Sequence, residues 1–278
     1  MSEAMLFRGQ LQSPEIIYWI ISLSMIACFA LNLVLAYFDP RTIDGVASVW
    51  AKPLKFELSL AIHAATLALV MSVLNTSIRS STIMVAIAVV FLAACIVEMT
   101  YIIGQAARAE HSHYNVSTPF NRLMWSVMAI AAIVIVGTAG AIGVATIFGS
   151  EESLAPALKW AIALGLIGGT LLTLYTAFTI GGRMSPYVGA VPADTEARMI
   201  LTGWSMVAGD LRVAHFLATH MIQAIPLIGL LVAQVAPGRF SIAIVVFAAL
   251  IWSAITLSEY GRALSGKPSL LAVSFGQH

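Results

Sequence analysis

Three residues that could carry chemistry lie deep inside apolar stretches of this sequence: His63, Glu98 and His220. A charged side chain in hydrocarbon costs about 2.5 kcal/mol or more, so such residues usually face a protein interior and mark a functional site. Imidazole nitrogens and a carboxylate can bind a transition metal, and the same groups can pass protons near neutral pH. The sequence therefore predicts a metal site or a proton pathway.

The three residues are expected at one depth. Each lies ten residues from the end of its apolar stretch, as measured from Pro53, Arg108 and Asp210. Ten residues of α-helix span about 15 Å. Since consecutive membrane helices run in opposite directions, these three ends lie on one side of the bilayer. The three side chains can therefore meet near mid-membrane if their helices are neighbours.

One face of the stretch that carries Glu98 is polar. Tyr101, Gln105 and Arg108 follow that carboxylate at steps of three, four and three residues, which places all of them on one stripe of a helix. We expect Glu98, Tyr101 and Arg108 to take part in chemistry. Gln105 is expected to contact a cofactor.

The stretch around His220 also has a polar half, which includes Arg212, His215 and Gln223. Because His215 and His220 are five residues apart, they diverge by about 140° on a helix and are not an i, i+4 metal pair. We expect His215 to be a further metal ligand. Arg212 and Gln223, with Lys55 from an earlier stretch, are expected to hold a cofactor.

The histidines allow several interpretations. His63 and His220 can be interior residues whose hydrogen bonds tighten packing, or axial ligands of a haem b. With Glu98 they can form a two-histidine, one-carboxylate iron site or a zinc site that holds a water. The same three groups can also relay protons. His113 is a second-tier ligand candidate from the connection that follows Glu98.

The elements that would position these residues are membrane-spanning helices. Of the 278 residues, 60% are hydrophobic and only 10% are charged, against about 25% charged in soluble domains. Apolar runs of about 18 or more residues indicate helices that cross a bilayer. We predict an all-α integral membrane bundle of about seven helices, forming one domain over 1–278. The spans are expected near 16–37, 54–74, 83–107, 123–148, 157–180, 210–234 and 239–261.

Other features narrow the classes of function. The net charge of +1 leaves no basic patch for nucleic acid. Cys28 and Cys95 lie inside apolar runs, where a thiol behaves as a small hydrophobe. The opening residues show no clear cleavage site, so we expect the first helix to be retained. Pro226 interrupts the sixth span and predicts a kink there.

The Lys and Arg residues predict an orientation, since cytoplasmic connections carry the excess. The N-terminal side holds four, namely Arg8, Arg79, Lys159 and Arg239. The other side holds ten, namely Arg41, Lys52, Lys55, Arg108, Arg122, Arg183, Arg198, Arg212, Arg262 and Lys267. We expect the N-terminus outside and the C-terminus in the cytoplasm of a bacterial inner membrane. Lys52 and Lys55, beside Trp50, are expected to anchor at lipid headgroups.

Several short motifs occur in the second and third spans and at the start of the sixth. They are Lys52-Pro-Leu-Lys-Phe56, Gln105-Ala-Ala-Arg108, Ser112-His-Tyr-Asn115, Thr118-Pro-Phe120 and Gly209-Asp-Leu-Arg-Val213, with His215 and His220. This combination resembles a group of bacterial multi-pass proteins labelled hypothetical. The resemblance implies no activity, catalytic residue or cofactor.

Two classes of function lead. The first is a protein that binds haem b or a single transition metal, iron or zinc, with a redox role toward a quinone or small lipophilic substrate. The second is a proton-coupled transporter, channel or sensor that uses the same residues as a relay. A non-catalytic assembly subunit is a third possibility. Gly165 and Gly169 suit close helix packing within the bundle or across a homodimer.

Overall fold

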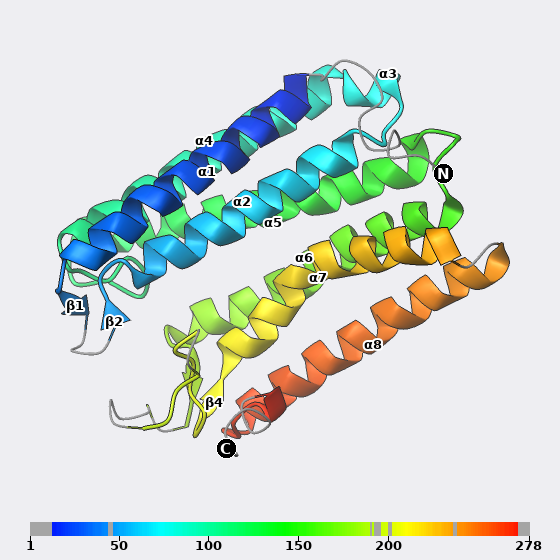
Figure 1. Cartoon of the computed structure of the whole chain (residues 1–278). Helices are drawn as coiled ribbons and strands as arrows, with labels where there is room; N and C mark the ends of the chain where they lie inside the picture. The colour runs from blue at the N-terminus through cyan, green and yellow to red at the C-terminus, as the bar shows by residue number, and fades with distance from the viewer. Residues whose placement is uncertain are drawn as a thin grey trace.

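The computed structural model is a bundle of long α-helices with two short pairs of strands (Figure 1). It describes residues 13–43, 47–189, 191, 196–199, 202–235 and 238–271. The helices are α1 (Ser13–Phe38), α2 (Ala51–Met71), α3 (Thr76–Arg79), α4 (Thr82–Ala107), α5 (Pro119–Gly149), α6 (Pro156–Arg183), α7 (Leu211–Val235) and α8 (Arg239–Leu264). The strands form two antiparallel pairs, β1 (Thr42–Ile43) with β2 (Ala47–Ser48), and β3 (Tyr187–Val188) with β4 (Gly209–Asp210).

Seven helices in the described ranges are long and apolar enough to cross a membrane, namely α1, α2 and α4 to α8. The predicted all-α membrane bundle is confirmed, and the chain is a multi-pass protein whose surroundings are a lipid bilayer. The predicted orientation of the termini stays a prediction.

Three helix starts lie three or four residues before the predicted ones. α1 begins at Ser13 rather than at 16. α2 begins at Ala51 rather than at 54, because Pro53 falls in the first helical turn, where a missing backbone N–H costs nothing. α5 begins at Pro119 rather than at 123. The hydroxyl of Thr118 accepts a hydrogen bond from the backbone N–H of Asn121 at 3.1 Å and so caps this earlier start.

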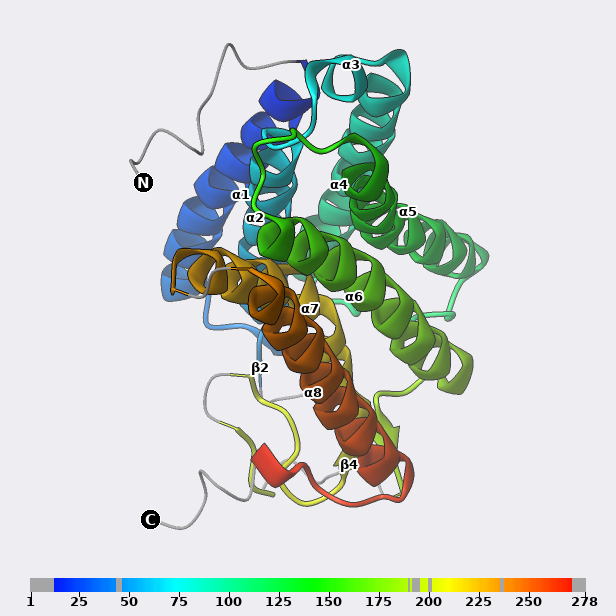
Figure 2. The ribbon, with the colours of Figure 1, turned by 90° about the vertical axis from the view of Figure 1, so that its right-hand side faces the viewer.

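The helices form two groups joined through α5. α1, α2 and α4 contact one another, α6, α7 and α8 form the second group, and α5 packs against both α4 and α6. α2 also contacts α7. Both views place the strand pairs at one end of the bundle and α3 at the other (Figures 1 and 2). The start of α2, the end of α4 and the start of α7 therefore lie at the same end.

Glycines allow α6 and α7 to approach closely. A Cβ atom added at Gly165 would lie 2.5 Å from Cδ of Pro226, and one added at Gly169 would lie 2.6 Å from Cγ1 of Ile222. Pro226 lies inside α7 as expected. The glycines therefore serve close packing within the bundle, as the sequence suggested, and a homodimer stays a prediction.

Candidate functional site

Ionisable side chains from four elements lie near the end of the bundle where α2 begins. Lys52, in the first turn of α2, lies within electrostatic range of Glu98 on α4 and of Arg212 on α7. His113, in the connection between α4 and α5, lies within range of Lys52. We call these four residues the Lys52 cluster. The packing of α2 against both α4 and α7 brings them together.

Glu98 is the buried member of the Lys52 cluster. Its side chain belongs to a residue that is 2% exposed, and its Oε2 atom has no hydrogen-bond partner in the described part of the chain. Glu98 and Lys52 interact over a distance rather than through a direct ion pair. A buried polar atom without a partner is costly, so its presence points to a functional requirement.

Lys52 lies close to the ring of Phe56 and within electrostatic range of Glu98, and its expected anchoring at lipid headgroups stays a prediction. Its ammonium lies 5.8 Å from the centre of the Phe56 ring, one turn deeper in α2. Among the described residues, no hydrogen-bond acceptor contacts it. Sequence reasoning missed this residue because a lysine in the first turn can point either outward or into the bundle.

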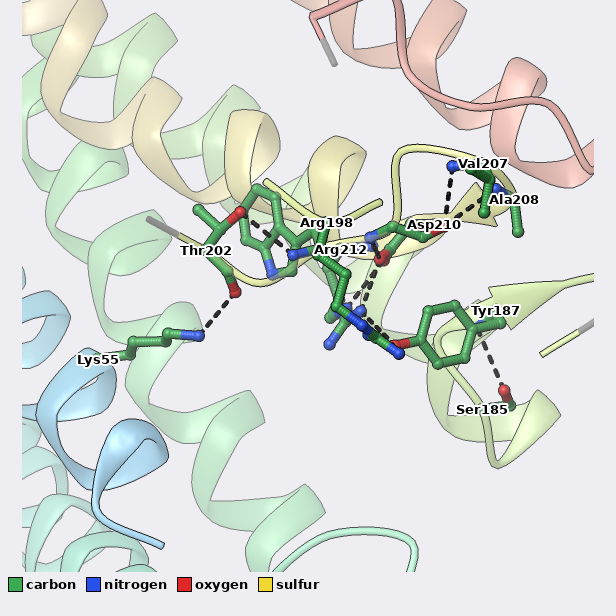
Figure 3. Close-up of polar contacts among 11 residues, drawn as sticks. Lys55, Ser185, Tyr187, Arg198, Thr202, Val207, Ala208, Asp210 and Arg212 are labelled. Atoms are coloured by element: carbon green, nitrogen blue, oxygen red, sulfur yellow. Dashed lines mark hydrogen bonds and ion pairs between the residues drawn. The ribbon is translucent and has the colours of Figure 1, made fainter. Parts of the chain in front are cut away.

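Lys55 ties α2 to the connection between α6 and α7. Its ammonium donates a hydrogen bond to the backbone carbonyl of Thr202 at 2.7 Å (Figure 3). This contact gives Lys55 a structural role, and its predicted role in holding a cofactor stays a prediction.

Arg212 is held by a carboxylate and a phenol (Figure 3). Its Nε and Nη2 atoms donate to the two oxygens of Asp210 at 2.8 and 2.6 Å, and Nη2 also donates to the hydroxyl of Tyr187 at 2.9 Å. Asp210 also accepts from the backbone N–H of Arg212 at 3.1 Å and so caps the start of α7. The charge of Arg212 is therefore balanced locally.

Aromatic rings surround His113. The ring centroids of Phe56 and Trp125 both lie 5.7 Å from that of His113, and Tyr114 stacks at a tilt on Trp125 at 5.2 Å. Burial lowers the pKa of His113 well below its usual value, and the positive charge of Lys52 lowers it further. Burial also raises the pKa of Tyr114 to about 12. Both side chains are thus neutral near pH 7, and the charge of the cluster depends on Lys52 and Glu98.

The rest of the predicted polar stripe on α4 serves a different contact. The Tyr101 hydroxyl donates to Oδ1 of Asn121 at 3.2 Å, and the Gln105 amide donates to the Tyr101 hydroxyl at 3.1 Å and to the carbonyl of His111 at 3.0 Å. Arg108 ends the helix in an exposed position. This network fastens α4 to α5 and does not reach Glu98, so a catalytic role for Tyr101 and Arg108 stays a prediction.

His63 lies deeper in α2. Its residue is 4% exposed, and its ring stacks on Phe91 with centroids 5.8 Å apart. Its Nε2 atom has no hydrogen-bond partner in the described ranges. The position is compatible with a metal ligand or with an interior histidine that packs on an aromatic ring.

The two histidines of α7 face different neighbours. Nδ1 of His220 lies 2.9 Å from the backbone carbonyl of Phe216, and Nδ1 of His215 lies 2.9 Å from the hydroxyl of Thr176 on α6. Neither of these two contacts uses the Nε2 atom of the ring. Gln223 is half-buried.

The structure brings His63, His215 and His220 toward one another. His220 lies within electrostatic range of both other histidines. No three His, Cys, Asp or Glu side chains are grouped as a metal site within the described residues. Glu98 interacts with Lys52 and Cys95 instead. The expected two-histidine, one-carboxylate group is therefore not assembled in this arrangement.

The sequence analysis did not single out the buried carboxyl of Glu57. Glu57 on α2 is 0% exposed, its Oε1 atom accepts a hydrogen bond from the Asn32 amide on α1, and its Oε2 atom has no partner among the described residues. The signal was present, because an acidic residue six positions before His63 and an amide within the first span both lie in apolar sequence.

No protein-family model, curated protein or solved structure matches this chain. The chemistry of the site must therefore be argued from the residues that the fold brings together.

Proposed function

We propose that this protein is a proton-coupled transporter or sensor in which Glu98 gains and loses a proton beside Lys52. One observation carries the proposal: a buried carboxyl, one oxygen of which has no hydrogen-bond partner among the described residues, lies within electrostatic range of a lysine that it does not contact directly. The orientation predicted from the Lys and Arg residues would open this site to the cytoplasm.

The charge states of the pair explain the coupling. When Glu98 is ionised, its charge offsets that of Lys52, and the pair is neutral overall. When Glu98 is protonated, the positive charge of Lys52 has no counterpart within the Lys52 cluster, since Arg212 is positive and His113 is neutral. Net charge is costly where water is scarce, so each protonation state favours a different set of surrounding contacts. Such a difference is what a proton-coupled device requires.

Infrared difference spectroscopy of the purified protein tests this proposal. A pH step is expected to change the carboxyl C=O stretching band, and Glu98→Gln is expected to remove one pH-dependent component of that band. Glu110→Gln serves as the matched control because that carboxylate is 47% exposed at the end of the bundle. If Glu98→Gln leaves the difference spectrum unchanged, Glu98 does not exchange a proton and the proposal fails.

The second candidate is a haem b or a single metal ion bound between α2 and α7. The observation that favours it concerns His63, whose Nε2 atom has no hydrogen-bond partner among the described residues and whose ring lies within electrostatic range of His220. Two histidines suffice for axial ligation of haem, and redox work toward a quinone would then follow. About one iron or one zinc atom is expected per purified chain. The His220→Ala variant should lose this metal, and the His111→Ala variant should retain it. Full retention in His220→Ala would exclude this candidate.

A further inference from the structure

We infer that a groove between α4 and α5 holds one diacyl phospholipid, with an acyl chain along the groove and the phosphate at Arg108. The groove has a volume of about 400 Å³, which lies within the range of about 300–1,000 Å³ typical of small-molecule sites. Its walls are side chains of α4 and of the first two turns of α5. The lipid site does not depend on the proposed proton exchange at Glu98.

The groove has the length and the polarity of one phospholipid. It follows α4 from Ile96 to Arg108, and these twelve residues rise about 18 Å. One leaflet is half of a hydrocarbon core that is about 30 Å thick. Arg108 ends α4 at the end of the bundle that carries the strand pairs (Figure 1). An acyl chain of one leaflet therefore fits below Arg108, with its headgroup at the depth of this guanidinium.

The groove opens toward the lipid that surrounds the bundle. Ile96 on α4 and Phe120 on α5 both line it and are each 56% exposed. The ring of Phe120 meets that of the buried Tyr101 edge to face, with centroids 6.4 Å apart. An acyl chain between these residues contacts both helices at once. Such van der Waals contact, rather than removal from water, drives association within hydrocarbon.

Gly104 keeps the groove open near its polar end. A Cβ atom added at Gly104 would meet no atom of a described residue within 4 Å outside its own stretch of helix. Close helix packing, which explains Gly165 and Gly169, therefore does not explain this glycine. A glycine inside a helix costs about 1 kcal/mol relative to alanine. The open space beside Gly104 is wide enough for a chain that lies against the α4 backbone.

Arg108 is the charged residue among those that line the groove. Its Nη2 atom donates a hydrogen bond to Oε1 of Gln105, which holds the guanidinium over the polar end of the groove. Oε2 of Glu110 lies 3.6 Å from the same atom, and the two side chains are 55% and 47% exposed. An exposed ion pair of this kind contributes only about 0–1 kcal/mol. A phosphodiester carries one negative charge and accepts two parallel hydrogen bonds from a guanidinium, so it matches Arg108 in charge and in shape.

Native mass spectrometry of the delipidated protein in detergent tests the inference, because it resolves each bound lipid. The first dioleoylphosphatidylglycerol is expected to bind about tenfold tighter than dioleoylglycerol, which has the same chains and no phosphate. Arg108→Gln should lower the affinity for phosphatidylglycerol to that for diacylglycerol, and the affinity for diacylglycerol should not change. Arg183→Gln is the matched control, because Arg183 is an exposed arginine in the last turn of α6 at the same end of the bundle. Both affinities should stay at the wild-type value in this control.

Two variants of Gly104 test the position of the acyl chain. Gly104→Ala adds one methyl group to open space and should keep both affinities within a few-fold of the wild type. Gly104→Leu fills the groove and should weaken the binding of both lipids at least about tenfold, the scale of a steric overlap in a packed site. All variants should elute as the same detergent-solubilised species.

Three outcomes would overturn the inference. The first is equal affinity of the wild type for the two lipids, and the second is wild-type affinity for phosphatidylglycerol in Arg108→Gln. Either result would show that no phosphate binds at Arg108. The third is wild-type affinity for both lipids in Gly104→Leu, which would place the acyl chain outside the groove.

Discussion

Replacing Glu98 with Gln is expected to remove about one titrating proton per chain. In the wild type, Glu98 should bind and release this proton as its charge changes beside Lys52. The glutamine side chain of the variant cannot ionise, and it mimics the protonated carboxyl in shape. Potentiometric titration curves of the two purified proteins should therefore differ by about one proton per chain.

Proton uptake after a pH jump gives an independent measurement of the same group. When the pH of a weakly buffered solution is lowered, the wild type should take up about one proton per chain more than Glu98→Gln, as reported by a pH indicator. Glu110→Gln should behave as the wild type. Equal proton uptake by the wild type and Glu98→Gln would assign the proton to another group.

Replacing Arg79 with Ala is expected to destabilise the protein by about 3–5 kcal/mol, the usual cost of leaving one member of a buried ion pair without the other. Nε of Arg79 lies 3.2 Å from Oε2 of Glu15, and their side chains are 8% and 1% exposed. Arg79 also donates to the carbonyl of Ser72 at 3.4 Å. The pair connects α3 to the first turn of α1, far from the Lys52 cluster (Figure 1).

Denaturant titration in detergent measures this effect. The double variant Arg79→Ala with Glu15→Gln should recover part of the lost stability, because it removes the stranded carboxylate. Arg122→Ala, which removes an exposed arginine, should change the free energy of unfolding by less than about 0.5 kcal/mol. A double variant less stable than Arg79→Ala alone would show that the stranded charge of Glu15 is not the source of the loss.

Much of the architecture could be predicted because the bilayer imposes a simple rule. A span needs a long apolar run with its backbone hydrogen bonds made internally. That rule identified the seven long helices of the described ranges, including α7, the helix that contains Pro226. It could not locate the start of α5, because a local cap at Thr118 decided that boundary.

The candidate site was predicted in part. His63 and His220 were expected at one depth, and the packing of α2 against α7 brings them within electrostatic range. Glu98 was expected beside them. It interacts instead with Lys52, a residue that the sequence marked only as a possible headgroup anchor. The depth of a residue follows from counting residues along its helix. The rotation of that helix against its neighbours, which decides what the residue contacts, cannot be obtained by counting.

The sequence by itself therefore determined the membrane-spanning class, the number of long helices and the depth of each ionisable residue. These properties depend on transfer of local segments from water to hydrocarbon, which adds up along the chain. The tertiary structure alone decided that Lys52 lies within electrostatic range of Glu98, that Asp210 and Tyr187 bind Arg212, and that Asn32 donates a hydrogen bond to Glu57. Those contacts join different helices, and helix neighbours are selected by side-chain packing and polar pairing across the bundle, which no single span contains.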